Sequence, residues 1–175
     1  MTKRLIIYST LLGMIAGGFF VWLSHPVRLF LVENKSIGQV LFCRRIDRPG
    51  FTFATVIRHS VQKTPVFEYY RLENDGNLLL TGTSLQDLGW GMPSTVNSTI
   101  EFKNNFMIID GINRLLKALP FRVSYIAEPH LIIQGAPIDL RKYVDDSDLI
   151  AVYSLLKPYI AYLLRGETNV FQAQS

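Results

Sequence analysis

Residues Leu5–Ser24 form a stretch of 20 residues without a charge, and no other feature constrains the chain as much. A helix of that length covers about 30 Å, the thickness of the hydrocarbon core of a bilayer. Lys3 and Arg4 precede the stretch, so the positive-inside rule predicts a cytoplasmic N-terminus and a body on the opposite side. Trp22 lies near the far end, where an aromatic ring suits the membrane interface. We therefore expect residues 1–26 to be a transmembrane anchor.

Two further interpretations concern the same stretch. Ala16–Gly18 could serve as the cleavage site of a signal peptide, but cleavage would leave the apolar residues Phe19–Leu23 at a new terminus, so we favour an uncleaved anchor. Ser9, Gly13 and Gly17 are spaced by four residues and form a small-xxx-small face. This face predicts close packing against a second membrane helix.

The composition narrows the class of protein to which the chain can belong. Hydrophobic residues make up 49% and charged residues 18% of the 175 residues, and the net charge is +4, which does not favour a nucleic-acid-binding protein. Cys43 is the single cysteine, so an intrachain disulfide is excluded, and its apolar surroundings predict a buried, inert thiol.

Residues 27–144 contain short apolar runs separated by turn residues, which predicts a mainly β domain, an antiparallel sandwich or small barrel. The predicted strands are Leu29–Val32, Gln39–Arg44, Phe51–Arg58, Val66–Glu73, Leu78–Thr83, Thr99–Lys103, Phe106–Ile109, Phe121–Ile126 and Leu131–Gln134. Asn74–Asn77 and Asn104-Asn105 predict tight hairpin turns. A short helix is expected over Ile112–Leu119, ended by Pro120.

Residues 145–175 are expected to form an amphipathic, mostly apolar helix and a tail. Acidic residues over 145–148 suit a helix start, and Leu149–Leu164 has a narrow polar stripe at helical spacing. Such a helix could pack on the sheet, lie at the membrane surface or dock on a partner. A second span is disfavoured, because Lys157 at mid-membrane would cost about 2.5–3.5 kcal/mol.

The most polar stretch runs from His59 to Glu68. On the predicted strand, Glu68 shares a face with apolar residues, so its carboxylate needs a partner, and Arg58, His59 and Lys63 are candidates. A hydrolase using His59, Ser60 and Glu68 is one hypothesis. We favour a structural or partner-facing role, in which His59, Ser60 and Thr64 cap a turn and Glu68 pins it, because adjacent residues on a strand point to opposite faces.

Gly89, Trp90, Gly91 and Pro93 form a second distinctive segment, in which Trp90 could anchor an interface or pack in the core. The three histidines and the cysteine are scattered, so no metal site is expected, and there is no phosphate-binding loop. We expect no catalytic residues and no cofactor.

Two motifs together resemble a bacterial family of domains of unknown function, small membrane-anchored proteins encoded with TAXI-type TRAP transporters. The likeness covers about residues 51–140. The residues that carry it are His59, Ser60, Val61, Lys63, Thr64, Pro65, Val66, Glu68, Gly89, Gly91 and Pro93. Trp90 departs from the family pattern, which has a small residue there.

The resemblance implies an accessory subunit of a sodium-driven, binding-protein-dependent importer of organic acids such as dicarboxylates. The expected partners are the membrane permease, the membrane lipid and the soluble binding protein. The body would lie in the periplasm, outside the bacterial inner membrane. The motif residues, Trp90 included, are then candidates for the partner interface. An alternative is a module that binds a small organic acid near Arg58, Lys63 and Arg71.

Overall fold

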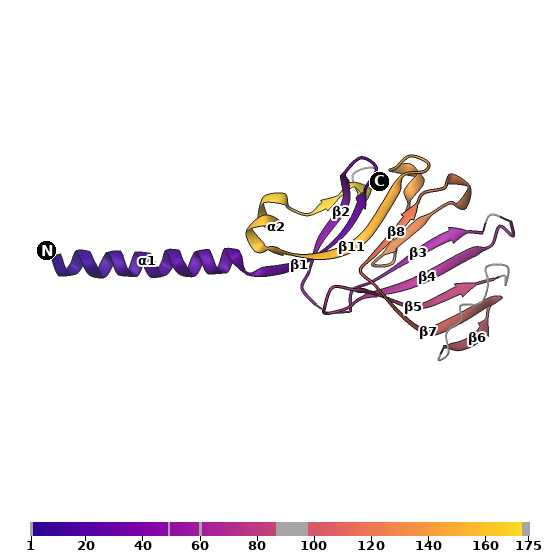
Figure 1. Cartoon of the computed structure of the whole chain (residues 1–175), viewed down its shortest axis with the longest axis horizontal. Helices are drawn as coiled ribbons and strands as arrows, with labels where there is room; N and C mark the ends of the chain where they lie inside the picture. Colours follow the sequence, from indigo (N-terminus) through magenta and orange to yellow (C-terminus); the bar gives the residue numbers. More distant parts are fainter. Residues whose placement is uncertain (1, 49, 60, 87–97, 173–175) are drawn as a thin grey trace.

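Two antiparallel sheets form the body, and one long helix leads into it (Figure 1). The computed structural model describes residues 2–48, 50–59, 61–86 and 98–172. The mainly β prediction is confirmed.

The first sheet has the strand order β12-β2-β1-β11-β8, so its strands come from both ends of the chain. Its strands are β1 Pro26–Asn34, β2 Gln39–Ile46, β8 Ala118–Arg122, β11 Leu149–Pro158 and β12 Thr168–Asn169. The second sheet has the order β10-β9-β3-β4-β5-β7-β6. Its strands are β3 Thr52–Arg58, β4 Pro65–Leu72, β5 Leu78–Leu85, β6 Thr99–Lys103, β7 Phe106–Leu116, β9 His130–Ile133 and β10 Ala136–Asp139.

The remaining elements are short apart from the first helix. They are α1 Thr2–Ser24, α2 Tyr159–Arg165 and the 3-10 turns η2 Tyr125–Ala127, η3 Leu140–Lys142 and η4 Val170–Gln172. Figure 1 shows α1 projecting away from the sheets, with α2 beside its C-terminal end.

One hydrophobic core lies between the sheets, which makes the body a sandwich. Phe30 of β1 is fully buried, and its ring lies 4.8 Å from that of Phe51 and 5.1 Å from that of Phe53. Ile150 of β11 and Tyr70 of β4 belong to the same cluster. Cys43 is 1% exposed, and burial raises the pKa of its thiol, so the predicted inert cysteine is confirmed.

The turn at residues 74–77 ties the sheets together. Gly76 has φ +94°, and a Cβ there would lie 1.8 Å from Nη1 of Arg28, so the position requires glycine. Ser154 Oγ donates to the Gly76 carbonyl at 2.7 Å, and Arg28 Nη2 donates to the Asn74 carbonyl at 3.0 Å. The predicted hairpin turn is confirmed and also docks on the other sheet.

The helix predicted over Ile112–Leu119 is wrong. Strand β7 runs on through most of this segment to Leu116 and pairs with β5 as far as Leu78↔Leu116. Gly111 (φ 80°) and Asn113 (φ 54°) adopt left-handed backbone angles that interrupt a helix. Pro120 lies in β8 at the sheet edge, where the missing N–H is tolerated. The strand predicted over 121–126 is also wrong beyond Arg122, because η2 follows.

The C-terminal amphipathic helix predicted over Leu149–Leu164 is also wrong. Residues 149–158 form β11, which pairs with β1 on one side and β8 on the other. Alternate side chains of β11 serve two clusters: Ile150 lies in the main core, and Tyr153 and Leu155 pack on the opposite face. Only Tyr159–Arg165 is helical. An apolar run buried on both faces of a sheet has no simple alternation that separates it from a helix.

Helix α1 exposes most of the large apolar side chains whose burial is described, including Ile7, Leu12 and Phe20, whereas Leu23 near its end is half-buried. Among the residues that the structure describes, no helix is long and apolar enough to cross a membrane.

Phe30→Ala should lower the free energy of unfolding by about 3–5 kcal/mol, because it opens a cavity where three aromatic rings meet. Phe102→Ala is the matched control, since Phe102 is 76% exposed, and it should change stability by less than about 0.5 kcal/mol. Urea unfolding of the full chain in detergent, followed by circular dichroism, measures both. Equal effects would contradict this assignment of the core.

Candidate functional site

The His59–Glu68 motif forms the connection between β3 and β4. The His59 amide donates to the Thr64 carbonyl at 2.8 Å, and the Lys63 amide donates to the His59 carbonyl at 3.0 Å. The His59 ring nitrogen Nδ1 accepts from the amides of Val61 and Gln62 at 3.3 and 3.2 Å. The histidine therefore caps a turn, as the preferred interpretation of the motif predicts.

Arg58 joins this turn to the segment after η2. Its Nη1 lies 2.6 Å from Oε1 of Glu128, and its Nε donates to the Lys63 carbonyl at 3.1 Å. The hydrogen bond from Arg58 holds the pKa of the Glu128 carboxyl below its usual range. Arg71 is occupied elsewhere, by Glu73 at 2.8 Å. The cavities described below are not lined by Arg58, Lys63 and Arg71 together, and an organic-acid site at these cations stays a prediction.

Glu68 lies on the face predicted for it, with Val66, Tyr70 and Leu72 buried beside it. Its partners differ from the prediction. Oε2 accepts from the Tyr70 hydroxyl at 2.7 Å and from the Thr55 hydroxyl at 3.4 Å, and Arg58 pairs with Glu128 instead. Burial and then the negative charge of Glu68 raise the pKa of Tyr70 far above its ordinary value. The half-buried Glu68 and the buried Tyr70 form an acid–phenol pair at the edge of the core.

A cavity of about 200 Å³ adjoins Glu68 between the two sheets. Its wall is mostly apolar and includes Ile57, Phe121 and Pro129, with His130 also lining it. The His130 ring Nδ1 is hydrogen-bonded to the Glu128 carbonyl at 2.7 Å. The cavity therefore combines a mostly apolar wall with two titratable side chains, Glu68 and His130.

Several predicted site residues lie outside the described part of the chain. They are Ser60, Gly89, Trp90, Gly91 and Pro93. The hydrolase hypothesis depends on Ser60, so its three-residue set stays a prediction. Thr64 and Pro65 lie where the turn enters β4, with Pro65 paired to Arg58 across the hairpin.

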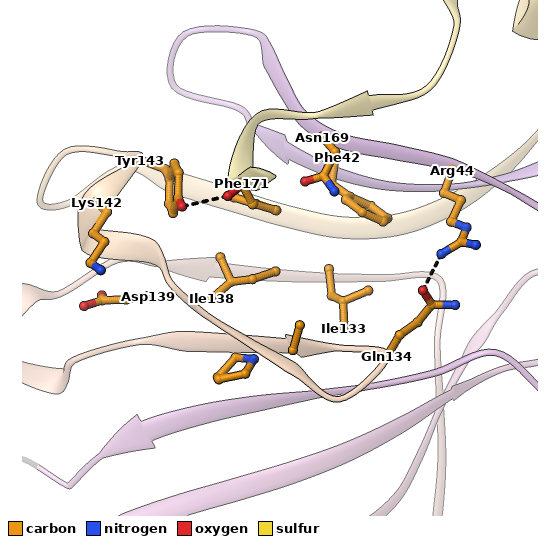
Figure 2. Close-up of a pocket in the computed structure, with 12 residues that line it drawn as sticks. Phe42, Arg44, Ile133, Gln134, Ile138, Asp139, Lys142, Tyr143, Asn169 and Phe171 are labelled. Atoms are coloured by element: carbon orange, nitrogen blue, oxygen red, sulfur yellow. Dashed lines mark hydrogen bonds between the residues drawn. The ribbon is translucent and has the colours of Figure 1, made fainter. Parts of the chain in front are cut away.

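A larger pocket opens along the edge where β2 and β12 of one sheet face β9 and β10 of the other (Figure 2). We call this pocket, lined in part by Phe42, Arg44, Ile133, Ile138, Lys142 and Asn169, the edge slot. Its volume is about 490 Å³. Figure 2 shows Phe42 and Asn169 on one wall, Ile133 and Ile138 on the other, and the cations Arg44 and Lys142 at opposite ends. The volume lies in the range of small-molecule sites.

Some polar side chains of the edge slot have hydrogen-bond partners within the protein, and one buried oxygen has none. Arg44 Nη1 donates to the Gln134 side-chain oxygen, and the Tyr143 hydroxyl donates to the Phe171 carbonyl at 3.0 Å. Asp139 is paired with Arg141 at 2.8 Å, and the hydrogen bond from Arg141 lowers the pKa of Asp139. Among the described residues, Oδ1 of Asn169 is the buried side-chain oxygen without a hydrogen-bond partner.

An aromatic cluster joins α1 to the body. The Tyr159 ring lies 5.1 Å from that of Trp22 and 4.9 Å from that of His25. The Arg45 guanidinium lies over Tyr159 and Tyr162 at 5.5 and 5.6 Å from the ring centroids. We call Trp22, His25, Tyr159, Tyr162 and Arg45 the aromatic junction. It fixes the end of α1 against α2 by ring and cation–π contacts.

The sequence interpretation did not single out Arg44, Lys142 or Asn169. These residues lie on β2, η3 and β12, far apart in the chain, and no spacing pattern connects them. Asn169 follows the polar residues Glu167 and Thr168, so no local signal in the sequence marks it as buried.

Fold and site together define a β-sandwich module carried on an apolar helix. A family model described as a domain of unknown function, DUF1850, matches residues 53–140, just over half of the chain. The chain belongs to this family. Searches of curated proteins and of solved structures found no match. The matched segment covers the His59–Glu68 turn and one wall of the edge slot.

Tyr70→Phe should destabilise the protein by about 1–3 kcal/mol at neutral pH, because Glu68 loses a buried donor. The difference from wild type should shrink above about pH 10. There the unfolded wild type releases the Tyr70 proton while the folded state retains it, so the wild type loses stability as the pH rises. Urea unfolding of both proteins across this pH range checks the prediction. A constant difference would contradict the raised pKa of Tyr70.

Proposed function

We propose that this protein is a membrane-anchored accessory subunit of a TAXI-type TRAP transporter. It packs on the permease and supports assembly or docking of the soluble binding protein. Transport of the organic acid belongs to the permease, and this chain has a non-catalytic role. The motif of residues 59–68 and its resemblance connect the chain to such transporters.

The observation that carries the proposal is helix α1. It has 23 residues, most of its described large apolar side chains are exposed, and it projects away from the two sheets (Figure 1). In the sequence, Leu5–Ser24 carries no charge and Lys3 and Arg4 precede it. An apolar surface of this extent needs a non-aqueous partner. A bacterial inner membrane, with the N-terminus cytoplasmic and the body periplasmic, meets that need.

The surface beside the aromatic junction supports the same orientation. Leu156, Ile160, Leu163 and Leu164 are exposed on the end of β11 and on α2. Trp22, Tyr159 and Tyr162 are residue types that favour the interface between lipid and water. We propose that this end of the body rests on the bilayer surface. The seven residues of α2 are too few for a span, so α2 would lie along the interface.

The helix also offers a face for the permease. A Cβ added at Gly13 or Gly17 would meet no atom within 4 Å, so the body leaves both glycines open. Together with Ser9 they keep the spacing that lets membrane helices approach closely. Among the described residues, no cluster of metal-ligating side chains competes with this role in binding a partner.

The orientation can be tested by labelling with a membrane-impermeant maleimide. A Phe102→Cys variant places an exposed thiol on β6, whereas the native Cys43 is buried, so the wild type gives the background. In spheroplasts we expect strong labelling of Phe102→Cys, and labelling of Thr2→Cys only after permeabilisation. The reverse pattern would contradict the proposed topology.

Assembly with the permease can be tested through the glycine face. Gly13→Ile with Gly17→Ile should keep the chain in the membrane, because isoleucine is apolar, but should release it from the permease. Leu12→Ile with Ile15→Leu is the matched control and should keep the complex.

Uptake by cells that carry permease and binding protein should fall when this chain is deleted. Full uptake without it would refute an essential role.

A further inference from the structure

We propose that the edge slot binds a small organic anion that carries a neutral hydrogen-bond donor beside an apolar ring or chain. The proposal is independent of the transporter role, because it depends on the unpartnered Asn169 oxygen and on the residues facing it. Its walls lie between the two sheets, where the sandwich is open along one edge (Figure 2).

The walls define the apolar part of the ligand. Phe42 and Phe171 contribute aromatic rings, which lie 6.3 Å apart at an interplanar angle of 16°. Ile133 and Ile138 face them from the other sheet. A space of about 490 Å³ lined in this way holds a single ring system or a short chain and leaves room for polar ends.

The charges at the ends define the sign of the ligand. Arg44 makes one side-chain hydrogen bond, to the neutral Gln134, and Lys142 makes no ion pair with another described residue. The one acidic lining residue, Asp139, is already paired with Arg141. The slot therefore presents an excess of positive charge, which favours a carboxylate.

Asn169 defines the third requirement. The sandwich contains a second buried asparagine, Asn34, whose amide has a partner at both ends: Nδ2 donates to Asp148 at 2.6 Å, and Oδ1 accepts from the Ser36 amide at 3.0 Å. Oδ1 of Asn169 has no such partner although it is buried against the slot. A buried acceptor without a donor is costly, and a ligand N–H or O–H would remove that cost.

Some residues of the edge slot lie inside the segment that the family model matches, and others lie outside it. Ile133, Ile138 and Asp139 lie in the segment matched by the family model, whereas Arg44, Lys142 and Asn169 lie outside it. The anion and donor preferences therefore come from parts of this chain beyond the matched segment.

Two probes of similar shape test the proposal. Indole-3-acetate offers a carboxylate, an apolar ring and an N–H donor, whereas 1-naphthaleneacetate lacks the donor. Titration calorimetry of the full chain in lipid nanodiscs should show indole-3-acetate binding about tenfold more tightly. Asn169→Leu should remove the difference between the probes. Arg44→Gln with Lys142→Gln should weaken both probes about tenfold or more.

The control is Lys117→Gln, an exposed lysine outside the slot, which should leave both affinities unchanged. Equal affinities of the two probes for wild type would overturn the proposal, as would no saturable binding of either below about 1 mM. If Asn169→Leu fails to fold, the affinities of the Arg44→Gln, Lys142→Gln double variant still decide whether the ligand must be an anion. If a water molecule satisfies Oδ1 of Asn169 in place of a ligand, neither probe should bind, and that result would overturn the proposal.

Discussion

Strand β1 is the element on which the rest of the structure depends. It pairs along its full length with β11 and also with β2, so it occupies the middle of its sheet. Its alternate side chains serve two hydrophobic clusters, with Phe30 and Val32 in the main core and Leu29 and Leu31 on the other face. His25 alone separates it from α1. The apolar helix is therefore attached directly to the central strand of the first sheet.

Two regions to which we assign proposed roles are therefore built on neighbouring strands of one sheet. The β1–β11 pair ends at Pro26↔Pro158, beside the aromatic junction, while the neighbouring β2 supplies Arg44 and Phe42 to the edge slot. A force on α1 would act on β1 and be shared by β2 and β11 through their ladders. The helix proposed to bind the permease continues into β1, and the neighbouring β2 lines the pocket proposed to bind an anion.

The sequence predicted what short-range patterns determine. Alternation placed Val66, Tyr70 and Leu72 on the buried face of β4, and Asn104-Asn105 formed the expected turn, with φ of 50° and 64°. It did not predict β11, because Leu149–Pro158 becomes a strand by pairing with β1 and β8, which lie far away in the sequence. For the same reason the slot was not foreseen: Arg44 and Asn169 become neighbours only after β12 pairs with β2. The sequence interpretation missed the partner of Glu68. It treated Tyr70, two residues away on the same face, as an apolar core residue and not as a hydroxyl donor.

The central claim is that this chain works as a membrane subunit of a transporter. Its most direct test is purification of the native complex in mild detergent through a C-terminal tag on this chain, with the co-purified proteins identified by mass spectrometry. The account predicts a TRAP-type permease in a fixed ratio to this chain, and its loss when Leu5–Ser24 is replaced by an unrelated membrane helix. Recovery of this chain from the membrane without a permease, or of the same permease with the unrelated helix, would contradict the claim.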